Sequence, residues 1–184
     1  MTAIRSSRNS PAHPDCIHSR GATPVDRLVI HTMEGTLPGS EAWFKRGRAE
    51  RDGKTPTAAH YLIGRLGDVV QMVPDDRLCY HCGMWNARSI GIEHEARIAP
   101  WGVRLRADGS VKPPPYPAGE FPEAMLLASA EVVAILCRKY QIPVDRAHIV
   151  GHSEVPGASH TDPGPDWPWD RYVAMVEAAW VRRA

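Results

Sequence analysis

The sequence has no apolar run of 18 residues, which is the length that a membrane-spanning helix needs, so we expect no membrane span. It also has no excess of either charge. The 22 basic and 21 acidic residues give a net charge of +1, and they are interspersed rather than blocked. This balance provides no electrostatic footprint for nucleic acid or for an anionic membrane surface. There is no internal repeat and no low-complexity segment, which excludes a solenoid.

The N-terminal region lacks the apolar core of a secretory signal. We expect residues 1–23 to form a poorly ordered N-terminal arm, and the protein to be made in the cytoplasm without a signal peptide. Residues 24–184 then form one domain, because 184 residues are enough for one sizeable core but too few for two. We expect this domain to be a monomer.

Four cysteines are present, and they lack the spacing of a complete structural zinc site. Cys79 and Cys82 have the spacing of half such a site, but no matching second pair follows. A zinc ribbon is therefore not expected. For these two residues and for Cys16 and Cys137, buried free thiols are the first interpretation and a disulfide is the alternative.

Local patterns predict strands and helices in mixed order. Apolar and β-branched runs predict strands over residues 24–31, 89–95 and 147–151, and a hairpin over 58–73. Helical spacing of apolar residues predicts helices over 40–47, 121–140 and 169–182. We expect residues 48–57 to form an exposed loop, and residues 98–119 to form an insertion with a short hairpin near Asp108 and Gly109. The fold class is therefore α/β: a single domain with a central mixed β-sheet flanked by α-helices.

The loop over residues 151–169 concentrates groups that can bind a metal. It contains His152, His160 and Asp162 among four prolines, which restrict its backbone. An imidazole and a carboxylate ten positions apart would suit two of the three protein ligands of a catalytic zinc. The alternative is that His152 only packs locally and Asp162 only begins a turn.

Two further ionisable residues end predicted strands. His31 closes the strand over 24–31, and the carboxyl ends of strands are where ligands collect in α/β folds. In strict alternation Glu93 points away from the face that carries Ile90 and Ile92. In a crevice, partial loss of water would raise the pKa of Glu93 toward the range of a general base. The alternatives are that His31 is a satisfied residue at the rim of the sheet and that Glu93 lies on a solvated strand face.

A glycine-containing loop carries His81, Trp85 and Asn86, and His60 begins the first strand of the hairpin. Aromatic and amide groups side by side suit a polar, partly apolar ligand such as a sugar or a peptide. The alternative is a loop that packs its own tryptophan.

Six motifs in order carry a family resemblance. VIHTMEG, AAHYLI, DVVQMVPDD, YHCG with Asn86, SIGIEHE and GHSEVPGASHTDPGPDWPW are similar to those of the zinc-dependent N-acetylmuramoyl-L-alanine amidases of the type 2 amidase and peptidoglycan recognition protein superfamily. The resemblance runs from about Pro24 to Val173. It implies cleavage of the amide between the lactyl group of N-acetylmuramic acid and the L-alanine of the stem peptide in peptidoglycan.

The resemblance also implies roles for individual residues. The zinc ligands would be His31, His152 and Asp162, and Glu93 would be the catalytic glutamate. Two neutral imidazoles and one carboxylate leave zinc a charge of +1, enough to acidify water and polarise a carbonyl. Positions that line the substrate groove correspond to His60, His81 and Asn86, beside which Trp85 is a further candidate.

Two positions depart from many relatives. A lysine that helps to stabilise the oxyanion is replaced by His160, which could donate the same hydrogen bond but is only partly charged at neutral pH. A tyrosine before the AAHYLI histidine is replaced by Ala59, which leaves Glu93 as the only obvious base.

We therefore expect a zinc amidase that acts at the cell wall, as a phage or prophage endolysin released through a holin; a cytoplasmic recycling enzyme suits the features less well. The alternatives from other classes are a peptidoglycan-binding recognition module without catalysis and a zinc peptidase that cuts within the stem peptide. Recognition modules typically lose a zinc ligand, whereas all three candidate ligands are present here.

Overall fold

A six-stranded sheet forms the centre of the computed structural model, which describes residues 4–98, 104–105, 111–112 and 116–182. Its strand order is β1-β5-β4-β7-β3-β10, with β1 Ser6–Asn9, β3 Arg27–Thr32, β4 Tyr61–Ile63, β5 Asp68–Gln71, β7 Ser89–His94 and β10 Ile149–Gly151. Within it β4 and β5 are antiparallel, and the other neighbours are parallel. The predicted α/β fold with a mixed sheet is confirmed.

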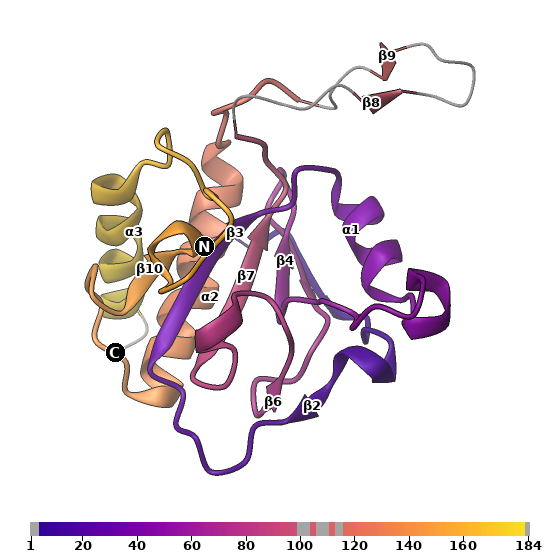
Figure 1. Ribbon diagram of the computed structural model, residues 1–184. Helices are drawn as coiled ribbons and strands as arrows, with labels where there is room; N and C mark the ends of the chain where they lie inside the picture. Colours follow the sequence, from indigo (N-terminus) through magenta and orange to yellow (C-terminus); the bar gives the residue numbers. More distant parts are fainter. Residues whose placement is uncertain (1–3, 99–103, 106–110, 113–115, 183–184) are drawn as a thin grey trace.

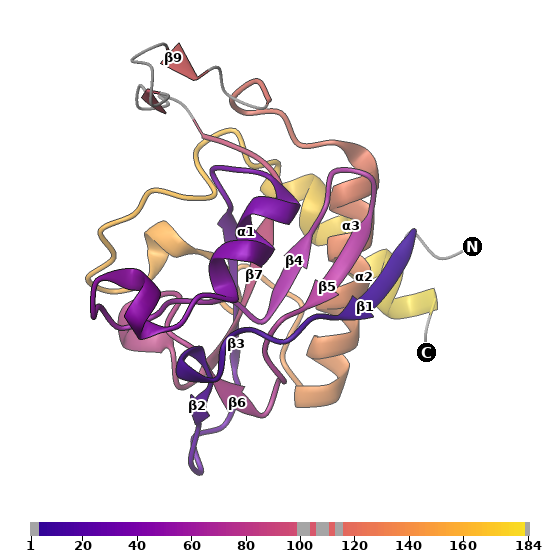
Figure 2. The same ribbon diagram turned by 90° about the vertical axis from the view of Figure 1, so that its right-hand side faces the viewer.

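Helices cover both faces of the sheet. Helices α2 (Glu123–Tyr140) and α3 (Trp169–Arg182) pack together on one face, and α1 (Leu37–Phe44) lies on the other (Figures 1 and 2). Short 3-10 helices are η1 Pro14–Cys16, η2 Arg48–Arg51, η3 Gly83–Trp85 and η4 His152–Glu154. Two small antiparallel pairs join β2 (His18–Ser19) to β6 (Arg77–Leu78) and β8 (Arg104–Leu105) to β9 (Val111–Lys112). None of the described helices is long and apolar enough to cross a membrane.

Alternation along the strands divides the core between the two faces. In β3, Leu28 and Ile30 pack toward α2 and α3, whereas Val29 belongs to a separate cluster with Val150. Ile90 and Ile92 of β7 also pack toward α2 and α3, because alternate side chains of a strand point to the same face. The opposite face of β7 is thereby left for Gly91 and Glu93, as its sequence predicts.

The N-terminal segment differs from the expected arm. Strand β1 pairs in parallel with β5, with Ser6 opposite Asp68, so it forms the edge of the main sheet. The side chain of Arg5 also binds Asp68, with Nε 3.0 Å from Oδ1. The expectation failed because the short polar segment SSRN has no apolar pattern; its pairing depends on a partner more than 60 positions away.

The first helix begins earlier than predicted. Thr36 is its N-cap, with Oγ1 accepting a hydrogen bond from the N–H of Gly39 at 3.2 Å, and Pro38 lies in its first turn. We expected this helix over residues 40–47, but a proline is well accommodated in a first helical turn, so the helix begins earlier and the threonine caps it. The following segment, residues 48–57, is exposed as predicted except at Arg51 and Pro56. The buried guanidinium of Arg51 donates to the carbonyl of Thr57 at 2.9 Å.

The other sequence assignments fit the structure closely. The hairpin over 58–73 becomes β4 and β5, and α2, α3, β7 and β10 lie within two residues of their predicted limits. The β8–β9 pair lies in the predicted insertion, whereas Asp108 and Gly109 lie outside the described residues. All four cysteines are buried and free.

Candidate active site

Parallel register brings three strand ends together at one edge of the sheet. His31 on β3 lies opposite Glu93 on the neighbouring β7. On the other side of β3, Gly151 of β10 lies opposite Ile30, so His152 follows directly beside His31. The carboxyl edge of a sheet is where side chains leave the core and face a crevice. Three candidates that are distant in sequence therefore meet there.

Asp162 bridges the two histidines. The Nδ1 atom of His31 lies 2.9 Å from one carboxylate oxygen of Asp162, and Nδ1 of His152 lies 3.1 Å from the other. One ligand atom from each of the three residues lies within 4.8 Å of the others. All three side chains are buried, at 2%, 8% and 6% exposure. This is the one such cluster of potential metal ligands that the structure contains over its described residues.

The chemistry of these three donors fits zinc. Two imidazoles and one carboxylate form a three-ligand set of the kind that catalytic zinc sites use, with one position left for water or substrate. Burial lowers the pKa of His31, which keeps its imidazole neutral and able to coordinate. Burial alone would raise the pKa of Asp162, but hydrogen bonds from both histidines hold it below its usual range. His31, His152 and Asp162 could therefore hold the metal.

A close-packed turn fixes the loop that carries His152 and Asp162. The N–H of Ser153 donates to the backbone carbonyl of Asp162 at 3.0 Å, and the N–H of Gly151 donates to the carboxylate of Glu154 at 2.6 Å. A Cβ atom on Gly151 would lie 2.7 Å from Cδ of Pro163. Gly151 is thus required so that the residue after Asp162 can pack against the end of β10.

Glu93 reaches the same pocket with an unsatisfied oxygen. Its Oε2 atom is buried and has no hydrogen-bond partner among the described residues. Burial raises its pKa well above the usual value for a glutamate, and the carboxylates of Asp162 and Glu34 add to this effect. A carboxyl group whose pKa is raised is suited to accept and return a proton at neutral pH.

His160 lies on the solvent side of the candidate ligands. Its ring stacks on that of His152, with centroids 5.0 Å apart and planes 13° apart. It is exposed and lines the pocket, so its N–H groups are available to a ligand there. This position is compatible with the hydrogen-bond donor that the sequence predicts.

The pocket around these groups has a volume of about 490 Å³. The candidate ligands, Glu34, Glu93 and His81 line it together with Phe44, Ala58 and Tyr80. The lining therefore combines carboxylates and imidazoles with apolar and aromatic side chains. The cavity has the size of a small-molecule binding site.

His81 and His60 have different positions relative to this pocket. His81 lines it, with Nδ1 3.0 Å from Nε2 of His31, and its ring lies over Gly91, where a Cβ atom would be only 2.5 Å away. His60 is fully buried. Its Nδ1 accepts from the N–H of Gly91, and its Nε2 lies 3.0 Å from the carbonyl of Arg77. The expectation that His60 lines the groove is therefore corrected: its ring supports the strands beneath.

The other two predicted groove residues also do not line the pocket. The side-chain oxygen of Asn86 accepts from the N–H groups of His81 and Cys82, at 2.9 and 2.8 Å, and so shapes the loop. The guanidinium groups of Arg27 and Arg88 lie over the ring of Trp85, 5.7 and 6.0 Å from its centroid. The packing alternative therefore describes this loop better than direct contact with a ligand.

Arg20 is a supporting residue that sequence reasoning missed. Its guanidinium is buried and donates to the carbonyls of Ala87 at 2.6 Å and Ser89 at 3.0 Å on one segment, and of Arg77 at 2.5 Å on another. These bonds join the two ends of the segment that contains His81. An isolated arginine beside a glycine gives no signal of such a role, because its acceptors are backbone carbonyls.

Comparison with known proteins finds relatives of this chain in sequence and in fold. The model of the family described as N-acetylmuramoyl-L-alanine amidase matches residues 21–165. N-acetylmuramoyl-L-alanine amidase A of Achromobacter lyticus is 27% identical over 177 residues, covering 86% of this chain and 87% of the relative. The 1,6-anhydro-N-acetylmuramyl-L-alanine amidase AmpD of Enterobacter cloacae is 30% identical over 121 residues, covering 65% and 57%. The crystal structure of an AmpD derivative superposes with a TM-score of 0.70 at 25% identity, covering 94% of this chain and 96% of that one.

The turn at Gly151 provides a test of how the loop is held. We expect Gly151→Ala to destabilise the protein by about 1–3 kcal/mol, because the added methyl group meets Pro163 and overpacks the turn. Urea unfolding followed by circular dichroism measures this. Gly35→Ala is the control, since its nearest contact would be an ordinary 3.6 Å to the carbonyl of Met33. Equal midpoints for Gly151→Ala and the wild type would contradict the packing described.

Proposed function

The chain belongs to the N-acetylmuramoyl-L-alanine amidase family and is a peptidoglycan amidase, and we propose that it works with a zinc ion held by His31, His152 and Asp162. The single observation that carries this proposal is the convergence of two imidazoles and one carboxylate, all buried, at the end of β3. When bound there, zinc would act as a Lewis acid, which lowers the pKa of water and polarises a carbonyl.

The protein's own groups account for the proton transfers. Glu93 accepts the proton of the water that attacks the lactyl carbonyl, and its raised pKa allows it to pass that proton to the departing nitrogen. His160 donates a hydrogen bond to the oxygen that becomes negative. The C–N bond breaks, which leaves a lactyl carboxylate on the glycan and a free amine on L-alanine.

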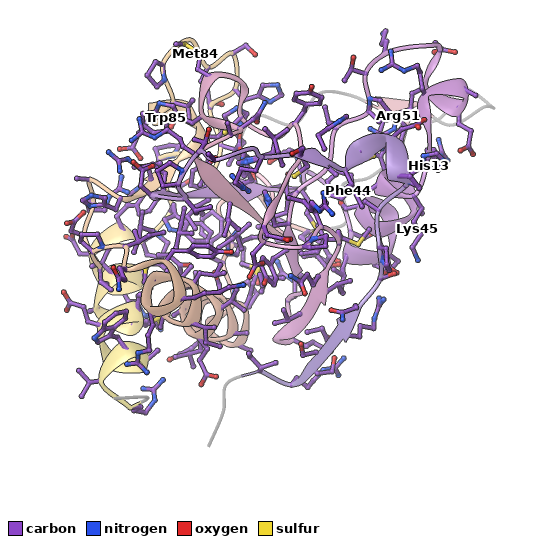
Figure 3. The ribbon with its side chains drawn as sticks, turned by 90° about the horizontal axis from the view of Figure 1, so that it is seen from below. His13, Phe44, Lys45, Arg51, Met84 and Trp85 are labelled. Atoms are coloured by element: carbon purple, nitrogen blue, oxygen red, sulfur yellow. The ribbon has the colours of Figure 1, made fainter. Side chains whose placement is uncertain are left out.

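We also propose a lytic role, in which the substrate is polymeric wall peptidoglycan and the enzyme acts as an endolysin. Large apolar side chains are exposed beside the elements that line the pocket: Trp43 is 45% exposed, Tyr80 37% and Met84 74%. Figure 3 shows Met84 and Trp85 together in the η3 loop, apart from Phe44 at the end of α1. Exposed apolar side chains in segments that line or adjoin a cavity suit sugar rings that continue past the cleaved unit.

A second candidate role is favoured by one comparison. The AmpD relative is named for 1,6-anhydro-N-acetylmuramyl-L-alanine, which is a small muropeptide rather than a polymer. A recycling enzyme with this substrate needs only the 490 Å³ cavity and gains nothing from exposed apolar groups outside it. The two roles therefore differ in the size of the preferred substrate.

Digestion of purified peptidoglycan tests the proposed reaction. We expect the wild-type protein to release glycan with free lactyl carboxylate and intact peptides beginning with L-alanine, as identified by mass spectrometry. A chelator should abolish release, and added zinc should restore it. Shortened peptides would indicate a peptidase, binding without release would indicate a recognition module, and full activity in chelator would contradict the zinc proposal.

Glu93→Gln tests the assignment of the proton acceptor. We expect kcat to fall about 10²- to 10⁴-fold, because glutamine cannot accept the proton, while zinc binding persists. Glu34→Gln is the matched control: Glu34 lines the same pocket and its pKa is raised by burial, but it receives hydrogen bonds from Thr32 and Ile98. Near-normal turnover by Glu93→Gln would show that Glu93 is not the base.

Substrate size tests the lytic role. We expect kcat/KM to be higher, by about tenfold or more, on intact sacculi than on soluble 1,6-anhydro muropeptide, at equal concentrations of cleavable bonds. Met84→Ser should lower activity on sacculi and leave activity on the soluble substrate unchanged, because Met84 lies outside the pocket lining. The reverse preference would favour the recycling role.

A further inference from the structure

A chain of buried hydrogen bonds connects the terminal helix to the backbone of His31. The hydroxyl of Tyr172 on α3 lies 2.6 Å from Oγ of Ser129 on α2. That oxygen lies 2.6 Å from Nε2 of His94 at the end of β7, and Nδ1 of the same ring lies 2.9 Å from the carbonyl oxygen of His31. The side chains of all three residues are completely buried.

The directions of these bonds follow from their acceptors. A carbonyl oxygen cannot donate, so Nδ1 of His94 carries the hydrogen and donates to His31. Nε2 is then an acceptor for the hydroxyl of Ser129, which in turn accepts from Tyr172. The ring nitrogens of His94 and the hydroxyl groups of Ser129 and Tyr172 therefore all have hydrogen-bond partners.

This chain of hydrogen bonds reaches β3 at the point where the pairing of β3 with β7 ends. The ladder between β3 and β7 ends at Thr32 and His94, directly beyond His31. There the N–H of Met33 donates to the carbonyl of His94 at 2.9 Å, while the His94 ring donates back to His31. One residue thus holds the backbone of residues 31–33 by both its main chain and its side chain.

The same ring also packs on the loop of the other two candidate ligands. The centroid of Trp167 lies 4.6 Å from that of His94, in an edge arrangement. Trp167 is 2% exposed and lies five residues after Asp162. His94 therefore contacts both segments that must stay aligned, the end of β3 and the 151–169 loop.

We propose that His94, fixed by Ser129 and Tyr172, is a positioning residue that holds His31 and the Asp162 loop in the geometry needed for tight metal binding. This inference rests on the proposed zinc site. His94 does not line the pocket, so it acts through the ligands and not on the substrate. Through this connection the layer of α2 and α3 influences the metal affinity of a site that contains His31, whose side chain points to the face of β3 opposite that of Ile30.

Zinc affinity of the folded metal-free protein tests this inference, measured by competition with a chromophoric chelator. We expect His94→Leu to raise the Kd for zinc by about tenfold or more, since groups that orient metal ligands typically contribute 10- to 100-fold. His94→Asn should stay within about threefold of the wild type, because its amide nitrogen takes the place of Nδ1 as donor to His31. Leu136→Ala is the control, a buried residue of α2 two turns beyond Ser129. It should lower stability without changing the Kd.

Equal zinc affinity of His94→Leu and the wild type would overturn the inference, and so would an equal loss in Leu136→Ala. If His94→Leu does not fold, Ser129→Ala decides the question, because it leaves the His94 ring in place without its partner. A several-fold rise in Kd is then expected, and an unchanged Kd would overturn the inference. A wild-type protein that binds no zinc would refute the proposed function and this inference together, whereas tight binding by every variant refutes the inference alone.

Discussion

The carboxylate of Asp162 joins two histidines that lie 131 and 10 positions away in sequence, and the site depends on this contact. Burial of the carboxylate opposes ionisation, but two imidazole donors compensate for it and keep the group charged. The contact also connects the 151–169 loop to the end of β3. The ring of His152, whose centroid lies 4.6 Å from that of His31, adds a second contact between the loop and His31.

The sheet and its helical layer provide the rigidity that this contact requires. Leu28 and Ile30 anchor β3 in the layer formed by α2 and α3, so the main chain leading to His31 has little freedom. Glu93 lies on the face turned away from that layer, with one buried oxygen unsatisfied. An unpaired buried carboxyl group is costly for stability, and its retention beside three potential metal ligands is understandable if it serves the reaction.

Much of this arrangement is predictable from sequence, because it depends on local patterns. The period of two in SIGIEHE separates Glu93 from the isoleucines, and the proline-rich loop marks Asp162. Features that depend on distant partners are not predictable in this way: the pairing of β1, and the burial of His60 beneath the pocket. Arg20 belongs to the same group, since its acceptors are backbone carbonyls that any sequence could provide.

The central claim is that one zinc ion binds between His31, His152 and Asp162. Crystals of the zinc-loaded protein, with diffraction recorded on both sides of the zinc absorption edge, test it most directly. The account predicts a single anomalous peak within about 2.0–2.2 Å of one atom from each of the three side chains. A peak beside Cys79 and Cys82, or none at the three residues in zinc-loaded protein, would contradict it.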